Sequence, residues 1–173
     1  MIYAALTFLV LFCILAAVDG TYFHFSKYKL DQRPESLREH AFHTARSLFF
    51  APMVLILFTF DSSGWLLWLA VLLVALDSVA LVLDLLEEEK SRKDIGGLSR
   101  AEYLIHVLAN GFHFTWVALI LASKDSADWA LDGGIVGDAS TATAVISGVI
   151  ALGGVLGAID HSVRLKRQVR RYS

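Results

Sequence analysis

Four ionisable side chains lie close together in the segment that runs from Arg38 to Arg46. Glu39, His40, His43 and Arg46 lie at spacings of three and four residues, so they share roughly one face of a helix. Neutral imidazoles and carboxylates are the usual ligands of zinc, manganese and non-haem iron. Alone, a His-x-x-His pair before an apolar run is typical of a solvated turn beside lipid headgroups. It becomes informative only if other segments bring similar side chains to the same depth.

Two further segments carry polar side chains in helical stripes. The stripes are formed by Glu102, His106, Asn110 and His113 in one segment and by Asp77 and Asp84 in another. Steps of three, four and seven residues place the members of each stripe on one helical face. A carboxylate inside an apolar segment needs a partner. For Asp77, a structural hydrogen bond to Asn110, His113 or Thr115 is the alternative to a functional role.

The composition indicates which elements position these side chains. The chain has 173 residues, of which 56% are hydrophobic and 18% charged, and its mean hydropathy is +0.59. Such a sequence is too apolar for an ordinary soluble domain. The net charge of −2, without a basic patch, gives no reason to expect nucleic acid as a partner. The single cysteine, Cys13, allows neither an internal disulfide nor a thiolate metal cluster.

We predict an all-α integral membrane protein, a five-helix transmembrane bundle that forms a single domain over residues 1–173. Apolar length and turn signals place the spans at about 2–24, 38–60, 65–86, 101–123 and 141–161. Pro34 is expected in the first turn of the second helix, and Pro52 is expected to kink it. Residues 87–100 are expected to form a solvated loop, and residues 124–140 a second loop. Gly153 and Gly157 form a GxxxG pattern that favours close packing within the chain.

The basic residues predict the orientation of the bundle. When five spans are threaded with the basic tail inside, 14 of the 15 basic residues fall on one side and only Lys124 on the other. This predicts an outside N-terminus and a cytoplasmic C-terminus. The same threading puts all six histidines in the inner half of the membrane or at its inner interface. Because ionisable groups in a membrane are costly, their convergence from five segments indicates a site.

The predicted site is a metal centre at the cytoplasmic side. Its candidate ligands are His43, His106, His113, His161, Asp77 and Asp160. Further ligands, or partners that orient the ligands, are Asp19, His24, Glu39, His40, Asp84 and Glu102. Arg46 is expected to anchor a headgroup or substrate. His106 and His113 lie about 10 Å apart along their helix axis, so one metal is not expected to bind both.

The candidate ligands outnumber the four that one tetrahedral site takes. The sequence therefore predicts two divalent metal ions, with iron favoured and zinc as the alternative. The chemistry is similar to that of the histidine-rich membrane desaturases and hydroxylases, whose non-haem di-iron centre lies near the cytosolic face and attacks lipid chains. Their diagnostic boxes contain HxxxH and repeated HxxHH, whereas this chain has only His40-x-x-His43 and no adjacent histidines. The likeness is therefore one of chemistry and identifies no family.

The leading hypothesis is a membrane-embedded metal-dependent enzyme that acts on a lipid or another hydrophobic substrate. A di-iron oxidoreductase is favoured over a metal-dependent hydrolase. No reductase motif is present, so an oxidase requires an external electron donor. The alternatives are an electron-transfer subunit linked to b-type haem or quinone, a metal or proton transporter, and a purely structural subunit. The expected location is the inner (cytoplasmic) membrane of a bacterium. The substrate and the oligomeric state are not predicted.

Overall fold

The computed structural model describes residues 1–132 and 139–173, and residues 133–138 of the second predicted loop lie outside the described residues. All regular structure in the described residues is helical, and five helices are long and apolar enough to span a membrane. The helices are α1 (Ile2–Val18), α2 (Leu37–Val54), α3 (Gly64–Arg92), α4 (Arg100–Ala122) and α5 (Thr141–Tyr172). The shorter elements are η1 (Asp19–Lys27), η2 (Leu30–Gln32), η3 (Pro34–Ser36), η4 (Leu55–Thr59), η5 (Lys93–Ile95) and η6 (Ser126–Trp129).

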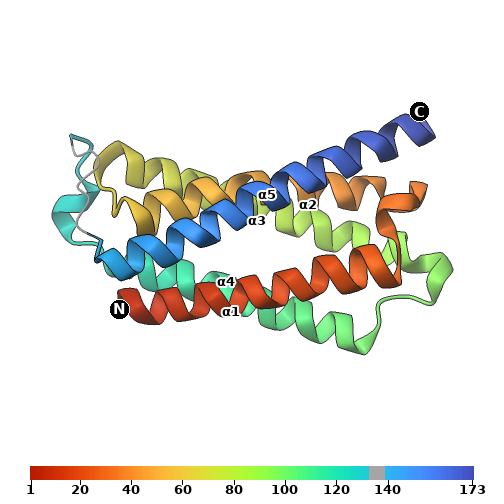
Figure 1. Cartoon of the computed structure of the whole chain (residues 1–173), viewed down its shortest axis with the longest axis horizontal. Coiled ribbons are helices and arrows are strands. Elements are labelled where there is room, and N and C mark those ends of the chain that lie inside the picture. Colours follow the sequence, from red (N-terminus) through yellow and green to blue (C-terminus); the bar gives the residue numbers. More distant parts are fainter. Residues whose placement is uncertain (133–138) are drawn as a thin grey trace.

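The long helices form two groups that lie side by side (Figure 1). Helix α1 packs mainly on α4, whereas α2 packs on α3 and on α5. Contacts between the two groups are fewer, and α1 and α5 meet only sparsely. The two groups therefore enclose a seam along the length of the bundle.

The half of the bundle that contains the N-terminus is a packed apolar core. Its largest fully buried side chains are Leu9, Met53, Leu57, Phe58, Leu67, Trp116 and Ile120. At the end of this half, the Lys124 ammonium group pairs with Asp61 and donates to the Ser62 carbonyl at 3.0 Å. The one cation that the threading places on this side is thus neutralised by a neighbouring carboxylate.

The other half of the bundle differs from the prediction, because the helices continue further. Helix α3 runs to Arg92, and Glu87, Glu88, Ser91 and Arg92 are buried. The prediction of a solvated loop over residues 87–100 is therefore wrong for residues 87–92, whereas the connection between α3 and α4 does lie within residues 93–99. Helix α5 likewise continues to Tyr172.

The C-terminal end of α5 is held by polar contacts to the connection between α1 and α2. The Gln168 amide donates to the carbonyls of Leu30 and Arg33, at 3.1 and 2.7 Å. Arg164 Nη1 donates to Asp31 Oδ2 at 3.0 Å. The Ser36 hydroxyl donates to the same two carbonyls, so Gln168 adds a second side-chain donor to each of them. These contacts attach the part of α5 beyond its apolar residues to the connection.

The two prolines and the glycine pattern can be compared with their predicted roles. Pro34 lies in the first turn, at the start of η3. Beyond Pro52, the helix changes to a π-helical turn, η4, since proline cannot donate a helical hydrogen bond. The prediction for the GxxxG pair is wrong. A Cβ at Gly153 or Gly157 would meet nothing within 4 Å, whereas at the adjacent Gly154 it would lie 2.8 Å from Phe50 Cδ1.

Candidate metal centre

Four helical segments each carry a pair of candidate ligands about one turn apart. The pairs are Asp19 and His24 on η1, Glu39 and His43 on α2, Asp84 and Glu88 on α3, and Glu102 and His106 on α4. All except the half-buried His43 are buried. The four pairs meet in one cluster, in the half of the bundle opposite the apolar core.

The pair on η1 depends on an unusual backbone. Asp19 and His24 are five residues apart, and in an α-helix such residues point about 140° away from each other. The π-helical turns of η1 bring residues at this spacing onto one face. As a result, His24 Nε2 lies 3.4 Å from Asp19 Oδ2.

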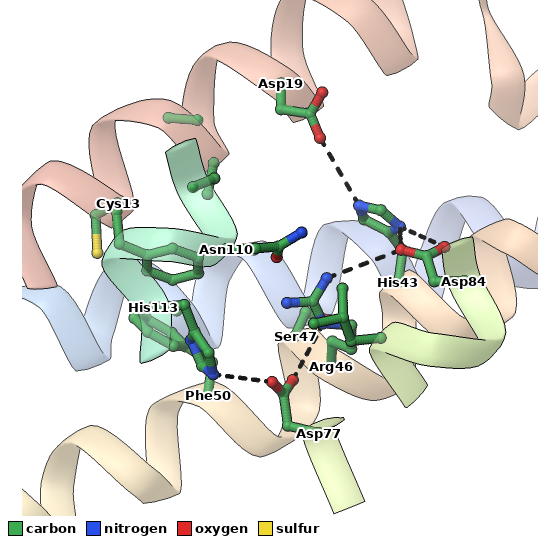
Figure 2. Close-up of a pocket in the computed structure, with 18 of the residues that line it drawn as sticks. Cys13, Asp19, His43, Arg46, Ser47, Phe50, Asp77, Asp84, Asn110 and His113 are labelled. Carbon is green, nitrogen blue, oxygen red and sulfur yellow. Dashed lines mark hydrogen bonds and ion pairs between the residues drawn. The ribbon is translucent and has the colours of Figure 1, made fainter. Parts of the chain in front are cut away.

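The histidines contact carboxylates from neighbouring helices (Figure 2). His106 Nε2 lies 3.0 Å from Asp19 Oδ1, and its Nδ1 lies 3.1 Å from Glu88 Oε1. His43 Nδ1 lies 3.0 Å from Asp84 Oδ1, and its Nε2 lies 4.0 Å from Asp19 Oδ2. Asp19 therefore connects ligands of η1, α2 and α4.

A buried guanidinium binds one oxygen of each of two glutamates in the cluster, Glu39 and Glu102. The Arg92 side chain is 0% exposed and donates to Glu39 Oε2 and, at 2.7 and 3.1 Å, to Glu102 Oε1. The Ser91 hydroxyl also donates to Glu39 Oε2. The other two oxygens, Glu39 Oε1 and Glu102 Oε2, are buried without a hydrogen-bond partner among the described residues. Buried polar atoms rarely lack partners, so these two oxygens are available to bind a ligand.

Three sets of side chains in this cluster could hold a metal ion. They are Asp19 with His24 and His43; His24 with Glu102 and His106; and Glu39 with His43 and Asp84. Within each set the ligand atoms lie within 4.8 Å of one another. Nitrogen and oxygen ligands bound about 2.0–2.2 Å from a zinc ion lie at most about 4.4 Å apart, so small side-chain movements would suffice. The sets share His24 and His43, as expected for adjacent metal positions.

A polar branch extends from the cluster toward the middle of the bundle. Arg46 Nη1 lies 3.8 Å from Asp84 Oδ2, and Arg46 Nε donates to Asp77 Oδ1 at 3.2 Å. On its other side, Asp77 Oδ2 lies 3.2 Å from His113 Nε2 (Figure 2). Asp77 and His113, two of the predicted ligands, thus form a separate pair. Arg46, predicted to anchor a headgroup or substrate, lies inside the bundle between two carboxylates.

Three other predicted residues lie beside the cluster. Asp160 is half exposed and accepts a hydrogen bond of 2.7 Å from Arg164. The ring of His161 lies 5.5 Å from that of His40 and 6.1 Å from that of His43, centroid to centroid. His40 Nδ1 lies 2.6 Å from Gln168 Oε1. None of Asp160, His161 and His40 belongs to the three sets within the described residues.

A cavity of about 460 Å³ borders the cluster. One end is polar and is lined by Asp19, His43, Asp84, Glu88 and His106. The other end is lined by Phe12, Cys13, Phe50 and Ile150 together with the Asp77–His113 pair, and glycines of α5 line one wall. Figure 2 shows Asp19, His43 and Asp84 toward one side of the cavity, and Cys13, Phe50 and His113 toward the other. Its size is typical of a pocket for a small organic ligand.

The sequence-based prediction omitted Glu88, Ser91, Arg92 and Gln168. The first three lie in the segment that was expected to be a solvated loop. Asp84, Glu88 and Arg92 follow one another at steps of four, so they could have been recognised as one helical stripe. For Gln168 we find no signal in the sequence, because its partners, which are two backbone carbonyls and the side chains of Ser36 and His40, all lie far from it along the chain.

The fold and the site together define a class of protein: a bundle of five helices that could span a membrane, with buried His/Asp/Glu groups that could hold metal ions. No protein-family model, curated protein or solved structure matches this chain. The function must therefore be argued from the chemistry of the site.

Proposed function

We propose that the protein is a membrane-embedded, metal-dependent enzyme, and specifically a non-haem di-iron oxidoreductase that acts on a lipid or another hydrophobic substrate. The observation that carries the proposal is the set of three overlapping ligand groups, drawn from four helical segments and bordering a cavity. A structural role alone does not explain why four segments each direct two ligands to one point.

The charges of the site support two divalent cations. Six carboxylates belong to the cluster and its branch, namely Asp19, Glu39, Asp77, Asp84, Glu88 and Glu102. Two guanidiniums, those of Arg46 and Arg92, lie among them. With neutral histidines and ionised carboxylates, four negative charges remain. Because buried charge is costly without compensation, two divalent ions fit this balance.

The ligand types favour iron. A mixture of carboxylates and imidazoles from facing helices is the usual donor set of di-iron and di-manganese bundles. When bound, two iron ions would supply reductive activation of dioxygen, with the electrons taken from an external donor. The residues of the chain hold the ligands in place: Arg92 orients Glu39 and Glu102 so that each directs one free oxygen into the cluster.

The apolar half of the bundle favours an enzyme over a transporter. A transporter needs ionisable or polar groups along its whole pathway. Here the buried core around Phe58 and Trp116 includes the hydroxyls of Thr143 and Ser147, but among the described residues the buried ionisable side chains lie in or beside the cluster and its branch and not in this core. We infer that the site is reached from the cluster end or from the membrane, not through the bundle.

The proposed location is the inner membrane of a bacterium, with the cluster at the cytoplasmic side. The basic residues near the cluster end support this orientation through the positive-inside rule. An electron donor would then act from the cytoplasm.

Metal analysis of the purified protein tests the proposal. In lipid nanodiscs we expect about two iron ions per chain and no haem Soret band. His24→Gln and Asp84→Asn should each lower the iron content, whereas Asp160→Asn, on the half-exposed neighbour of the cluster, should not. A folded protein without metal would refute the proposal. Zinc in place of iron would indicate a hydrolase, in which a metal-bound water is the nucleophile.

A further inference from the structure

The cavity opens sideways between α1 and α5. Among the described residues that line it, three are exposed at the surface of the bundle: Ala16, Ala17 and Gly153. The two alanines belong to α1 and the glycine to α5, and these helices make few contacts with each other. The exposed lining residues thus mark an opening in the seam between the two helix groups.

The opening is bordered by residues that have small side chains or none. A Cβ placed at Gly20, Gly153 or Gly157 would meet nothing within 4 Å, so there is open space beside each of these glycines. All three line the cavity. Gly148 has the same open surroundings on α5 but does not line the cavity. A substitution at Gly148 can therefore serve as a control for the same substitution at Gly153 and Gly157.

Beyond the opening, toward the C-terminal end of α5, the two walls are joined. The Arg164 guanidinium lies 4.2 Å from the centroid of the Phe25 ring and donates to Asp31. These contacts connect α5 to η1, which contains Phe25, and to η2, which contains Asp31. The opening therefore lies in the apolar part of the helices, next to the hydrocarbon region of a bilayer.

The cavity runs from the polar cluster toward the middle of the bundle. Asp84, beside the cluster, and Asp77, at the level of the branch, are separated by about 10 Å along α3. The apolar end, at Phe12, Cys13 and Phe50, extends toward the packed apolar core. Along the membrane normal, carboxylates and imidazoles line the cavity near the interface. Nearer the centre, the apolar side chains of Phe12, Cys13 and Phe50 share the lining with Arg46, Asp77 and His113, whose polar groups are paired with one another. A lipid in the leaflet on the cluster side has its headgroup at the first level and its chain at the second.

We propose that the cavity binds one hydrocarbon chain of a glycerophospholipid, which enters between α1 and α5 while the headgroup stays at the interface on the cluster side. The chain end then lies against Phe12, Cys13 and Phe50, and the carbons nearest the headgroup face Asp19, His43 and Asp84. Binding does not depend on metal. The consequence for the reaction rests on the proposed function: with dioxygen as oxidant, and two electrons from the external donor together with two protons, a C–H bond near the headgroup would become C–OH while the second oxygen atom leaves as water. The far end of the chain would be unchanged.

Photo-crosslinking in nanodiscs tests this proposal. Metal-free protein is reconstituted in phosphatidylglycerol doped with the same lipid bearing a diazirine either near the acyl carboxyl or near the terminal methyl. After illumination, crosslinked residues are identified by peptide mass spectrometry. We expect the distal probe to label the Phe12–Cys13 and Phe50 peptides, and the proximal probe to label peptides around Gly20 and His43. Labelling only of residues outside the cavity, or the reverse order of the two probes, would overturn the proposal.

The glycines provide the matched variants. The double variant Gly153→Leu and Gly157→Leu should reduce cavity labelling to the level without illumination, whereas Gly148→Leu should leave it unchanged. Cavity labelling that persists in the double variant would refute entry between α1 and α5. Iron content is measured on parallel samples. Labelling as expected without any metal binding would overturn only the proposed di-iron function, whereas metal binding without cavity labelling would overturn only the lipid site.

Discussion

Arg92→Met removes a cation on which two buried carboxylates depend. The Arg92 side chain is 0% exposed, and the side chains of Glu39 and Glu102 are at most 2% exposed. Methionine retains an unbranched, flexible side chain but is shorter by the guanidinium end, so the change removes the charge and the hydrogen-bond donors while keeping part of the packing. Each glutamate then keeps its negative charge, or takes up a proton, without its partner.

The expected loss of stability is large. Breaking a buried ion pair by removing one partner costs about 3–5 kcal/mol, because the remaining charge is uncompensated. For a chain of this length this corresponds to a fall in Tm of about 6–20 °C. The Tm of Arg92→Lys should lie between those of the wild-type protein and Arg92→Met. An ammonium group keeps the positive charge but lacks the planar guanidinium that binds two carboxylates.

Thermal unfolding in detergent, followed by circular dichroism, measures the effect. The control is Arg38→Met, because the Arg38 side chain is 72% exposed, its pair with Glu87 is 3.4 Å long, and a surface pair contributes about 0–1 kcal/mol. Ferrous iron at about 100 times its Kd should restore about 2.7 kcal/mol to Arg92→Met, since metal binds only the folded site. Equal Tm values for Arg92→Met and Arg38→Met would refute the assignment of Arg92 as the buried counter-charge.

Three further changes test other parts of the structure. Gly154→Leu should lower stability by about 1–3 kcal/mol in thermal unfolding, because a Cβ there would lie 2.8 Å from Phe50, whereas Gly148→Leu should be tolerated. Gln168→Leu removes one of the donors to the carbonyls of Leu30 and Arg33 and should speed amide hydrogen exchange in residues 30–36; unchanged exchange would contradict the assigned role. Deletion of the exposed Thr21 would place Asp19 and His24 four residues apart, which an ordinary α-helix keeps on one face. The iron content should then be retained, and a loss as large as in His24→Gln would contradict the role assigned to the π-helical turns.

The five long helices could be predicted because their main signal is local. Runs of apolar residues of the right length, bounded by turn residues such as those at 61–64, are visible within a single segment. The cluster-side ends could not be predicted in this way. Residues 87–92 are rich in charge and resemble a solvated loop, yet α3 continues through them. Their burial depends on Glu39 and Glu102, which come from distant parts of the chain.

The sequence predicted the level in the bundle at which the site lies, but it did not predict which side chains contact one another there. Threading the spans brings Asp19, His43, Asp84 and His106 to one level, and these residues do lie in one cluster. Depth alone does not show which way a side chain points around its helix axis. Asp160 and His43 are at similar depths, but Asp160 is on a half-exposed face and pairs with Arg164. The direction in which a side chain points is set by the helices that pack against its own helix.

The two π-helical segments show how a local and a tertiary cause can be separated. In α2, the change to π-helical bonding follows Pro52, whose missing N–H is a covalent cause that is visible in the sequence. No proline lies in or near η1, so its π-helical turns need another cause. The other three ligand pairs of the cluster are four residues apart and suit an α-helix, whereas Asp19 and His24 are five apart. We infer that the contacts of these two side chains, with His106 and Glu39, favour the π-helical backbone. Since π-helical turns are frequent at functional sites, this departure from α-helical geometry is itself an argument that the cluster is functional.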